Sequence, residues 1–472
     1  VGFAESGEHF ELVKWLKERV ETTTLYMMGM WAILAADKGN LDMLKWVCSF
    51  SEEIDLKRPL RDAIDNGHLD VVKWIVPQID TEADNFHFDV DDACLHEHYE
   101  VVEWLVQHYP SKCCFAFADR DAARRGRLDI VRLLHTNNVS GCSKRIIDCA
   151  ALRGHLDIVK WLQSCSHKTS HEYSEYEAID DAASNGHLEI VQWLHENTDE
   201  GCSTKAMNSA AFNNHFETIK WLHEHRTEGC TEVAMDHAAF NGNLQLVQWF
   251  SENRTEGCTT SAMDLAACRG HLEVVKWLHE NREEGCTTDA MDNAAKYGHL
   301  DVIKWLHETR NEGCTTKAMD GAAERGYLDV VQWLHENRSE GCTTKAMDGA
   351  AKNQLWDVVH WLDCNRPEGA TVATMVSMAH HGNMDGIIWG YYIGPTPCNA
   401  SVVVEAVLSG HFAIARFLHQ EQEWSECDVI SALRECSNEN RRWEFAEWMH
   451  LHYQDEFESI AEEVFADPPQ VG

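Results

Sequence analysis

The stretch TTSAMDLAACRGHLEVVKWLHENREEGC, residues 259–286, contains two short amphipathic segments separated by a glycine. Thr260 is expected to cap a first helix, and Gly270 is expected to end it. A second helix is expected to run from about His271 to about Arg282. Because the apolar side chains of each segment gather on one face at 100° per residue, the stretch predicts a helical hairpin.

The helical phase assigns a direction to each side chain of this hairpin. The buried face of the first helix is expected to hold Met263, Ala266, Ala267 and Gly270, and the opposite face Leu265, Cys268 and Arg269. The buried face of the second helix is expected to hold Val274, Val275 and Leu278, with Glu273, Lys276 and Glu280 facing water. Trp277 falls at the edge of that buried face, so it is expected to pack between neighbouring hairpins.

The same pattern recurs along the whole chain. Its tryptophan column occupies sixteen positions: Trp15, Trp46, Trp74, Trp104, Leu133, Trp161, Trp193, Trp221, Trp249, Trp277, Trp305, Trp333, Trp361, Trp389, Phe417 and Trp448. From Trp193 to Phe417 the spacing is 28 residues at every step. A single hairpin of this length cannot bury its own apolar face, so each one must stack on the next.

The repeats predict a fold class and a domain organisation. We expect an all-α solenoid of about sixteen helical hairpins that forms a single continuous domain over residues 1–472. Within it, residues 1–192 hold irregular repeats, residues 193–390 hold regular 28-residue repeats, and residues 391–472 hold divergent repeats and an acidic cap.

Three segments carry a resemblance to a known family. AACRGHLEVVKWLHENR (266–282), AAKYGHLDVIKWLHETR (294–310) and AASNGHLEIVQWLHENT (182–198) resemble ankyrin repeats, with a tryptophan in a leucine position. The chain departs from the 33-residue ankyrin unit because most of its units have 28 residues, which implies short turns between units in place of full β-hairpins. A second departure replaces the family's histidine with Asp264, Asp292, Asp320 and Asp348. The histidine's hydrogen-bond bridge therefore cannot be carried over unchanged.

The charge of the chain bears on its partners. Acidic side chains number 78 against 40 basic ones, a formal net charge of −38, and the hydrophobic share of 44% is that of a folded chain. Such a field repels phosphate backbones, which argues against nucleic acid as a partner. Protein partners with basic segments are expected, unless the excess acid is only a solvated surface. No run of 18 apolar residues occurs, so no membrane span is expected.

Seven cysteines share one repeat column: Cys142, Cys202, Cys230, Cys258, Cys286, Cys314 and Cys342. Stacked helices lie about 8–10 Å apart, which is farther than the Cα separation of about 7 Å that a disulfide tolerates. The column is therefore expected to hold small buried side chains, and an intracellular, cytoplasmic location is favoured over secretion. Four N-x-S/T sequons, at Asn138, Asn253, Asn337 and Asn399, leave secretion as the alternative.

Neither a metal site nor catalysis is expected. His271 and His279 stand eight residues apart, roughly 12 Å along a helix, which is too far for both to bind one ion. Two irregular clusters offer metal-ligating side chains without a recognised zinc spacing: Cys165, His167 and His171, and residues 96–100 with His108, Cys113 and Cys114. The chain contains no phosphate-binding loop and no nucleophile elbow, so we expect no enzyme and no cofactor.

The columns around the double alanine vary between the regular units while their neighbours stay constant. The resemblance places this face of the first helix on a concave groove, so partner binding is predicted there. The predicted site comprises Ser209, Phe212, Asn213, His237, Phe240, Asn241, Leu265, Arg269, Asn293, Lys296, Tyr297, Glu324 and Arg325. Phe212, Phe240 and Tyr297 are expected to be exposed anchors. The alternative is neutral variation on a solvated face.

Two functions remain open at this point. The first is a non-catalytic scaffold or adaptor that binds protein partners through the concave face. The second is a spacer or targeting array within a longer protein whose effector domain lies outside this chain, because Val1 falls inside the first helix of a unit. Oligomeric state is not indicated by the sequence.

Overall fold

The computed structural model describes residues 14, 25–81, 86–114, 116–136, 146–165, 177–199, 201–392 and 398–421. The chain divides into two compact units, unit 1 (Val1–Thr231) and unit 2 (Glu232–Gly472), which are treated separately below. The repeats at Trp15 and Trp448, the acidic segment after residue 421 and Cys142 lie outside the described residues.

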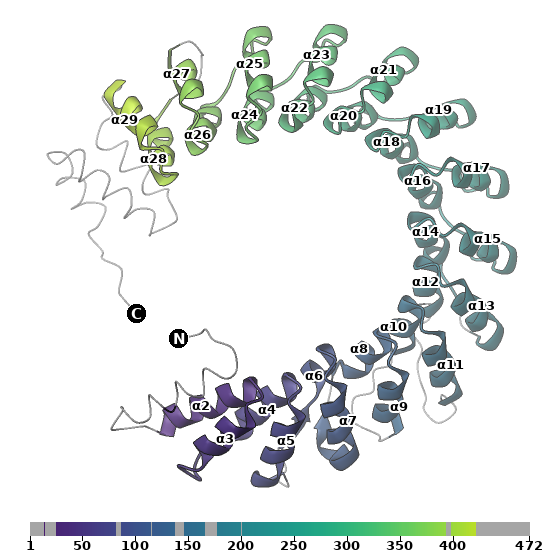
Figure 1. The fold of residues 1–472 in the computed structure, drawn as a ribbon. Coiled ribbons are helices and arrows are strands. Elements are labelled where there is room, and N and C mark those ends of the chain that lie inside the picture. Colours follow the sequence, from purple (N-terminus) through teal and green to yellow (C-terminus); the bar gives the residue numbers. More distant parts are fainter. Residues whose placement is uncertain are drawn as a thin grey trace. The chain divides into compact units, whose positions relative to one another are not determined.

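Unit 1 consists of helix pairs in which an even-numbered first helix is followed by an odd-numbered second helix (Figure 1). Its elements are α2 (Leu25–Asp37), α3 (Leu41–Cys48), α4 (Lys57–Asp65), α5 (Leu69–Ile75), η1 (Val76–Gln78), β1 (Phe88–Asp89), α6 (Asp91–Leu95), α7 (Tyr99–His108), η2 (Pro110–Lys112), β2 (Cys113–Cys114), α8 (Ala118–Arg124), α9 (Leu128–Thr136), α10 (Ile146–Arg153), α11 (Leu156–Cys165), α12 (Glu177–Ser184), α13 (Leu188–Asn197), α14 (Thr204–Phe212) and α15 (Phe216–His225). Strands β1 and β2 form a short parallel pair in the register Phe88 to Cys113.

Unit 2 repeats the same pair more regularly, with its first helices in one row and its second helices in another (Figure 1). Its elements are α16 (Val233–Phe240), α17 (Leu244–Asn253), α18 (Thr260–Cys268), α19 (Leu272–Asn281), α20 (Thr288–Lys296), α21 (Leu300–Thr309), α22 (Thr316–Arg325), α23 (Leu328–Asn337), α24 (Thr344–Lys352), α25 (Trp356–Asn365), α26 (Val372–His380), α27 (Met384–Tyr392), α28 (Ala400–Leu408) and α29 (Phe412–Glu421).

The predicted all-α repeat fold is confirmed, and one predicted cap is wrong by a residue. Helix α18 begins at Thr260, and its cap is Thr259, whose hydroxyl accepts from the Ser261 N–H at 3.0 Å. The cap lies one residue earlier because Thr259 also contacts Asp236 in the preceding helix pair. Helix α19 runs from Leu272 to Asn281, as the periodicity predicts to within a residue.

The core of each unit lies between the two rows of helices. First helices contribute buried pairs such as Ala266 and Ala267, and second helices contribute buried residues such as Val275 and Leu278. The small alanines allow neighbouring first helices to pack closely, as α18, α20, α22 and α24 do in turn. Cys258, at 7% exposure, is a buried free thiol, as predicted for its column.

The tryptophan column packs between neighbouring pairs, as predicted. The Trp305 ring is half-buried and meets the edge of the His279 ring from the preceding pair, with ring centroids 5.3 Å apart. The same contact joins His307 to Trp333 and, in unit 1, His195 to Trp221. The tryptophan column therefore serves the stacking of neighbouring helix pairs and does not form an aromatic binding stripe.

A glycine and a histidine form a second contact between pairs. Gly242 follows α16 with φ +71°, a left-handed conformation that glycine adopts without strain. The His271 ring lies against it so closely that a Cβ on Gly242 would stand 2.5 Å from His271 Nδ1. In unit 1 the Nε2–H of His68, in the same column, donates to the Asp37 carbonyl at 3.0 Å.

An aspartate of one pair holds the cap of the next. Asp264 accepts from the Thr287 N–H at 2.8 Å and from the Thr287 hydroxyl at 2.8 Å, while that hydroxyl accepts from the Asp289 N–H. The arrangement recurs at Asp180–Ser203 in unit 1 and at Asp236–Thr259, Asp292–Thr315, Asp320–Thr343 and Asp348–Thr371 in unit 2. We call these contacts the Asp–Thr bridges. They occupy the column in which ankyrin repeats have histidine.

An Arg–Glu clamp closes six successive loops between helix pairs, from Arg226–Glu228 to Arg366–Glu368. Arg254 follows α17, and its guanidinium donates to both carboxylate oxygens of Glu256, whose Oε2 also accepts from the Thr255 N–H at 3.0 Å. Burial raises the pKa of Glu256, but the hydrogen bonds from Arg254 and the backbone outweigh it and lower the pKa to about 2. Further along, Arg310 also donates to His279 Nδ1 at 3.3 Å.

In the described parts of the chain, every helix is too short or too polar to cross a membrane.

The Asp–Thr bridges are expected to stabilise the stack measurably. Asp320→Ala leaves the Thr343 N–H without its acceptor, which costs about 1–3 kcal/mol of unfolding free energy. Asp320→Asn should cost less than about 1 kcal/mol, because Asn208 makes the same bridge to Thr231 with its Oδ1 accepting and its Nδ2 donating. Urea unfolding followed by circular dichroism measures both, with Glu336→Ala as an exposed control for the lost charge.

The clamps are expected to make part of the stability depend on acid pH. The pKa of Glu256 lies at about 2 in the folded chain and near 4.5 ordinarily, so its stabilisation is complete above about pH 4.5. It is lost progressively as the pH falls from about 4.5 to about 2. Glu256→Gln should therefore lower the urea midpoint at pH 7 and differ from wild type by progressively less toward pH 2. A difference that stays constant with pH contradicts the assignment.

Candidate functional site

The predicted site residues lie on the first helices or on the residue after each of them. Three belong to unit 1: Ser209 and Phe212 on α14, and Asn213 after it. Ten belong to unit 2: His237 and Phe240 on α16 with Asn241 after it, Leu265 on α18 with Arg269 after it, Asn293 and Lys296 on α20 with Tyr297 after it, and Glu324 and Arg325 on α22. We call their exposed and half-buried side chains the first-helix face.

None of these side chains belongs to the buried core, but their exposure differs by column. The column of Ser209, His237, Leu265 and Asn293 is half-buried because neighbouring first helices flank it. Phe212 and Tyr297 are 46% and 39% exposed, as expected for anchors. Phe240, which was also predicted to be exposed, is half-buried, and the Arg269 guanidinium lies over its ring.

Two aromatic rings of unit 2 carry an arginine from the next helix pair. The Arg269 guanidinium lies 4.3 Å from the Phe240 ring centroid, and the Arg325 guanidinium lies 4.7 Å from that of Tyr297. Such stacks hold a long cationic side chain in one orientation while its remaining N–H groups stay available. The structure therefore brings four of the predicted residues together in pairs.

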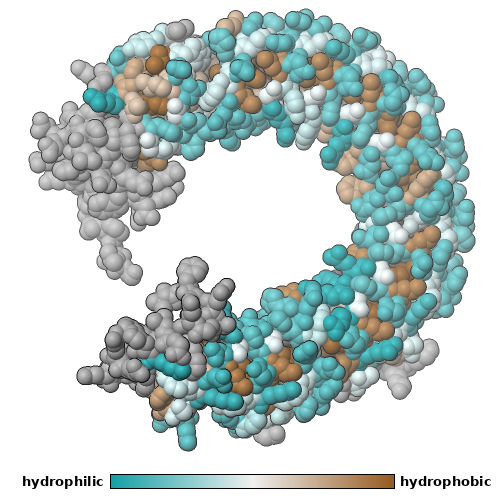
Figure 2. All heavy atoms as spheres, viewed as in Figure 1, coloured by the Kyte–Doolittle hydropathy of each residue, from teal (hydrophilic) through white to brown (hydrophobic). Residues whose placement is uncertain are grey.

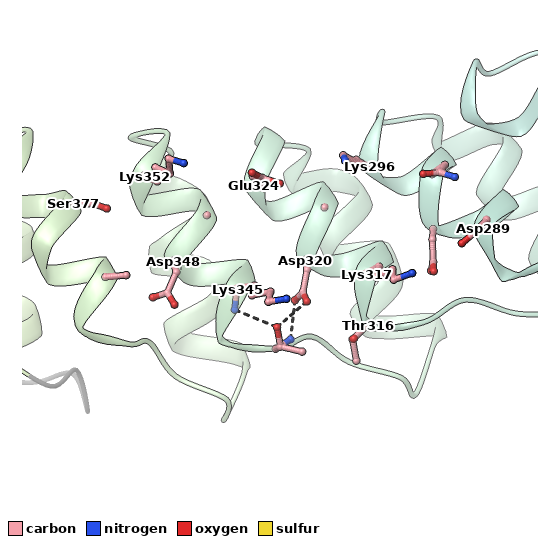
Figure 3. A pocket seen from close by; sticks show the side chains of 16 residues that line it. Asp289, Lys296, Thr316, Lys317, Asp320, Glu324, Lys345, Asp348, Lys352 and Ser377 are labelled. Atoms are coloured by element: carbon pink, nitrogen blue, oxygen red, sulfur yellow. Dashed lines mark hydrogen bonds between the residues drawn. The ribbon is translucent and has the colours of Figure 1, made fainter. Parts of the chain in front are cut away.

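A groove of about 760 Å³ runs along the first-helix face of unit 2 (Figure 3). It is lined from α20, α22, α24 and α26, and it includes the predicted residues Asn293, Lys296 and Glu324. Figure 3 places Lys296, Glu324 and Lys352 at one end of these helices, and Lys317 and Lys345 toward the other end. Outside this groove, Figure 2 shows hydrophobic residues as separate patches within a mostly hydrophilic surface.

Two glycines make the floor of this groove. Gly321 and Gly349 stand in the column that holds leucine or asparagine in the preceding pairs, and both lie inside helices. A Cβ on Gly321 would lie 3.0 Å from the Lys296 Cβ, and a Cβ on Gly349 would lie 3.1 Å from the Glu324 Cβ. The helices therefore pack closely here, and the Lys296 and Glu324 side chains occupy the space that a β-carbon would need.

The sequence analysis missed three lysines of this groove, Lys317, Lys345 and Lys352. Lys352 occupies the same column as Lys296, so the rule that selected Lys296 could have found it. Lys317 and Lys345 lie in the first turn of α22 and α24, away from the variable columns beside the double alanine. The sequence feature that distinguishes these two lysines is their position in the first turn of a helix, where the helix dipole disfavours positive charge.

Two irregular clusters, residues 96–100 with His108, Cys113 and Cys114, and Cys165 with His167 and His171, were considered as metal sites from the sequence. The side chains among them that the structure describes are not arranged as metal ligands. His108 Nδ1 bonds the Trp104 carbonyl at 2.8 Å, and the Cys114 thiol bonds the Phe88 carbonyl. Burial raises the pKa of Cys113 to about 12, which keeps it a thiol. His167 and His171 lie outside the described residues. Across the described residues, no three His, Cys, Asp or Glu side chains gather in a way that could hold a metal ion.

The cysteines of the repeat column that the structure describes are buried thiols. Burial raises the pKa of Cys258 to about 12 and that of Cys286 to about 11, so both stay thiols at neutral pH. Cys268, on the first-helix face, has a pKa that burial raises, although the charges of Arg269 and Lys296 act to lower it. These thiols serve packing.

Comparison with known proteins identifies the repeats. Models of ankyrin repeats match residues 179–264 with three copies, and residues 120–163, 262–307 and 291–335 as further copies. No curated protein matches the chain. The predicted resemblance is thus confirmed, and these repeats belong to the ankyrin repeat family.

Proposed function

We propose that this chain is a non-catalytic scaffold that binds protein partners through the side chains of the first-helix face. Ankyrin repeats generally mediate protein–protein interactions and are generally non-catalytic. The proposal depends on one observation: the repeat positions that join the helix pairs are constant, and the exposed positions beside them vary. Constant columns hold the pairs together through the Asp–Thr bridges and the Arg–Glu clamps, while variable columns hold exposed side chains on the same rigid helices.

The composition of the variable columns supports binding over neutral variation. Tyrosine and arginine are enriched among the residues that contribute most to protein interfaces. Here Tyr297 and Arg325 are stacked on each other before any partner arrives, which lowers the entropic cost of ordering them on binding. Tyr297 is 39% exposed to water. A surface that contacts only solvent does not require a large aromatic side chain at such a position.

Three finer predictions belong to this proposal. Partners with basic segments would match the net charge of −38, and nucleic acid would be repelled by it. The buried free thiols support an intracellular location. The spacer alternative differs in one respect, because a spacer needs no specific partner on the first-helix face.

Substitution of the aromatic anchors is the test of this function. Phe212→Ala, Phe240→Ala and Tyr297→Ala together remove three predicted anchors, each worth about 1–2 kcal/mol at an interface. Quantitative affinity capture with the full chain as bait should recover at least about tenfold less of each specific partner.

The matched control removes three aromatic side chains elsewhere: Phe50, Phe117 and Tyr392, which are 41%, 55% and 58% exposed. This control variant should retain its partners. Circular dichroism and urea unfolding verify that both variants fold. If both triple variants recover the same amount of each partner, the proposal is wrong and the spacer function is favoured.

A further inference from the structure

The turn between the two helices of a pair contacts the next pair along the chain. In the pair of α16 and α17 the turn residue is Gly242, and the residue that faces it is His271, directly before α19. We call a turn residue and its facing residue a turn couple. Ten turn couples within the two units have glycine in the turn: Gly39–His68, Gly67–His98, Gly126–His155, Gly154–His187 and Gly186–His215 in unit 1, and Gly242–His271, Gly270–His299, Gly298–Tyr327, Gly326–Leu355 and Gly382–His411 in unit 2.

The facing side chain occupies the space in which a β-carbon of the turn residue would stand. A β-carbon on these ten glycines would lie 2.4–3.0 Å from an atom of the facing residue, which is closer than van der Waals contact. Several of the histidine rings are also bonded to the preceding pair. The Nε2–H of His155 donates to the Arg124 carbonyl at 3.0 Å, and the Nε2–H of His411 donates to the His380 carbonyl at 3.1 Å. Turning such a ring aside would therefore break a hydrogen bond between pairs.

Two turn couples within the units have neither glycine in the turn nor a histidine, tyrosine or leucine opposite it. They are Gln354 with Asn383 in unit 2 and Glu97 with Arg127 in unit 1. Both turn residues keep a left-handed backbone, with φ +61° at Gln354 and +66° at Glu97. The fold thus tolerates the backbone strain at these two turns. Backbone conformation alone does not explain why the other ten turns have glycine.

The facing residues of these two couples make their hydrogen bonds within their own helix. Asn383 Oδ1 accepts from the Gly386 N–H at 2.9 Å, in the first turn of α27. The Arg127 guanidinium donates to the two carboxylate oxygens of Asp129 at 2.9 and 2.6 Å, in the first turn of α9. A facing residue therefore takes one of two forms. It lies on a glycine of the preceding pair, or it bonds its own helix.

We propose that each turn couple is a matched steric pair that selects which helix pair can stack on which. A glycine turn accepts a pair whose facing residue is histidine, tyrosine or leucine. A turn residue that has a β-carbon accepts a pair whose facing residue bonds its own helix, as Asn383 does. The inference concerns the surfaces between helix pairs and does not depend on the proposed function.

The usual role of glycine after a helix predicts a different pattern. Glycine at that place relieves a left-handed backbone whatever residue the next pair presents. It therefore predicts no relation between the turn residue and the facing residue. A steric match predicts that the glycine and the ring are lost together, as they are at Gln354–Asn383 and at Glu97–Arg127.

Transfer of the second kind of couple into the regular region tests the match. The variants of the full chain are Gly242→Gln, His271→Asn and the double variant, and hydrogen–deuterium exchange mass spectrometry measures the protection of α16 to α19. Gly242→Gln should lower the protection at least about tenfold, because it adds both backbone strain and a clash with the His271 ring. The double variant should be protected at least about fivefold more than the product of the two single effects predicts, because the clash is gone.

A matched control joins Gly242→Gln with His299→Asn, whose histidine faces Gly270 instead. The two effects of this control should simply multiply, because the two side chains belong to different couples.

The reverse exchange keeps the test decisive where Gly242→Gln fails to fold. Gln354→Gly alone should raise the protection of α24 to α27, because it removes backbone strain. Asn383→His alone should lower that protection, because it loses the bond to the Gly386 N–H and places a ring against Gln354. Gln354→Gly should improve the Asn383→His variant at least about fivefold more than it improves wild type.

Two results would overturn the inference. The first is that the single effects multiply in either exchange, so that the turn residue and the facing residue act independently. The second is that His299→Asn rescues Gly242→Gln as well as His271→Asn does. If no variant with Gly242→Gln folds, the reverse exchange alone decides between a matched couple and independent residues.

Discussion

The structure depends on one constraint: a helix pair of 28 residues cannot bury its own apolar face. Each pair therefore needs a neighbour, and polar contacts fix how the neighbours meet. The Asp–Thr bridge does this most directly, because one hydroxyl of Thr287 both caps its own helix and donates to Asp264 of the preceding pair. The same hydroxyl therefore caps a helix and joins two helix pairs, so a substitution of Thr287 removes both contacts.

The features that the sequence predicted correctly are those that depend on the residues of a single helix pair. Helix bounds, the buried double alanine and the half-buried position of Trp277 follow from helical phase, because each depends on residues within a few turns. The cap was placed one residue late because the choice of Thr259 over Thr260 depends on Asp236, 23 residues earlier, in another pair. The Arg–Glu clamp was missed for a different reason. Its R-x-E-G-C pattern recurs plainly, but its role requires knowing that the loops of neighbouring pairs touch.

The candidate site was predictable as a set of columns but not as a surface. Variation between units pointed to Phe240, Arg269, Tyr297 and Arg325, and the structure pairs them across neighbouring helix pairs. The groove could not be predicted, because a glycine in a helix reads in sequence only as a weak helix former. That the Lys296 side chain lies directly against Gly321 depends on how closely α20 and α22 pack.

The separation of columns has a consequence for specificity. Residues such as Asp320 have both carboxylate oxygens engaged within the stack, so they cannot change without loss of stability. At the ends of the first helices the contacts between pairs differ from one pair to the next: Asn213 donates to the Ser184 carbonyl, whereas Arg325 stacks on Tyr297. On the proposed function, a partner that lies along several pairs gains a small contribution from each of them. The affinity is then greatest when the spacing of the partner's groups matches the spacing of the pairs, because all the contacts can form at once. If the proposed function holds, the bridges contribute to specificity because they keep the exposed side chains of neighbouring pairs at a fixed spacing.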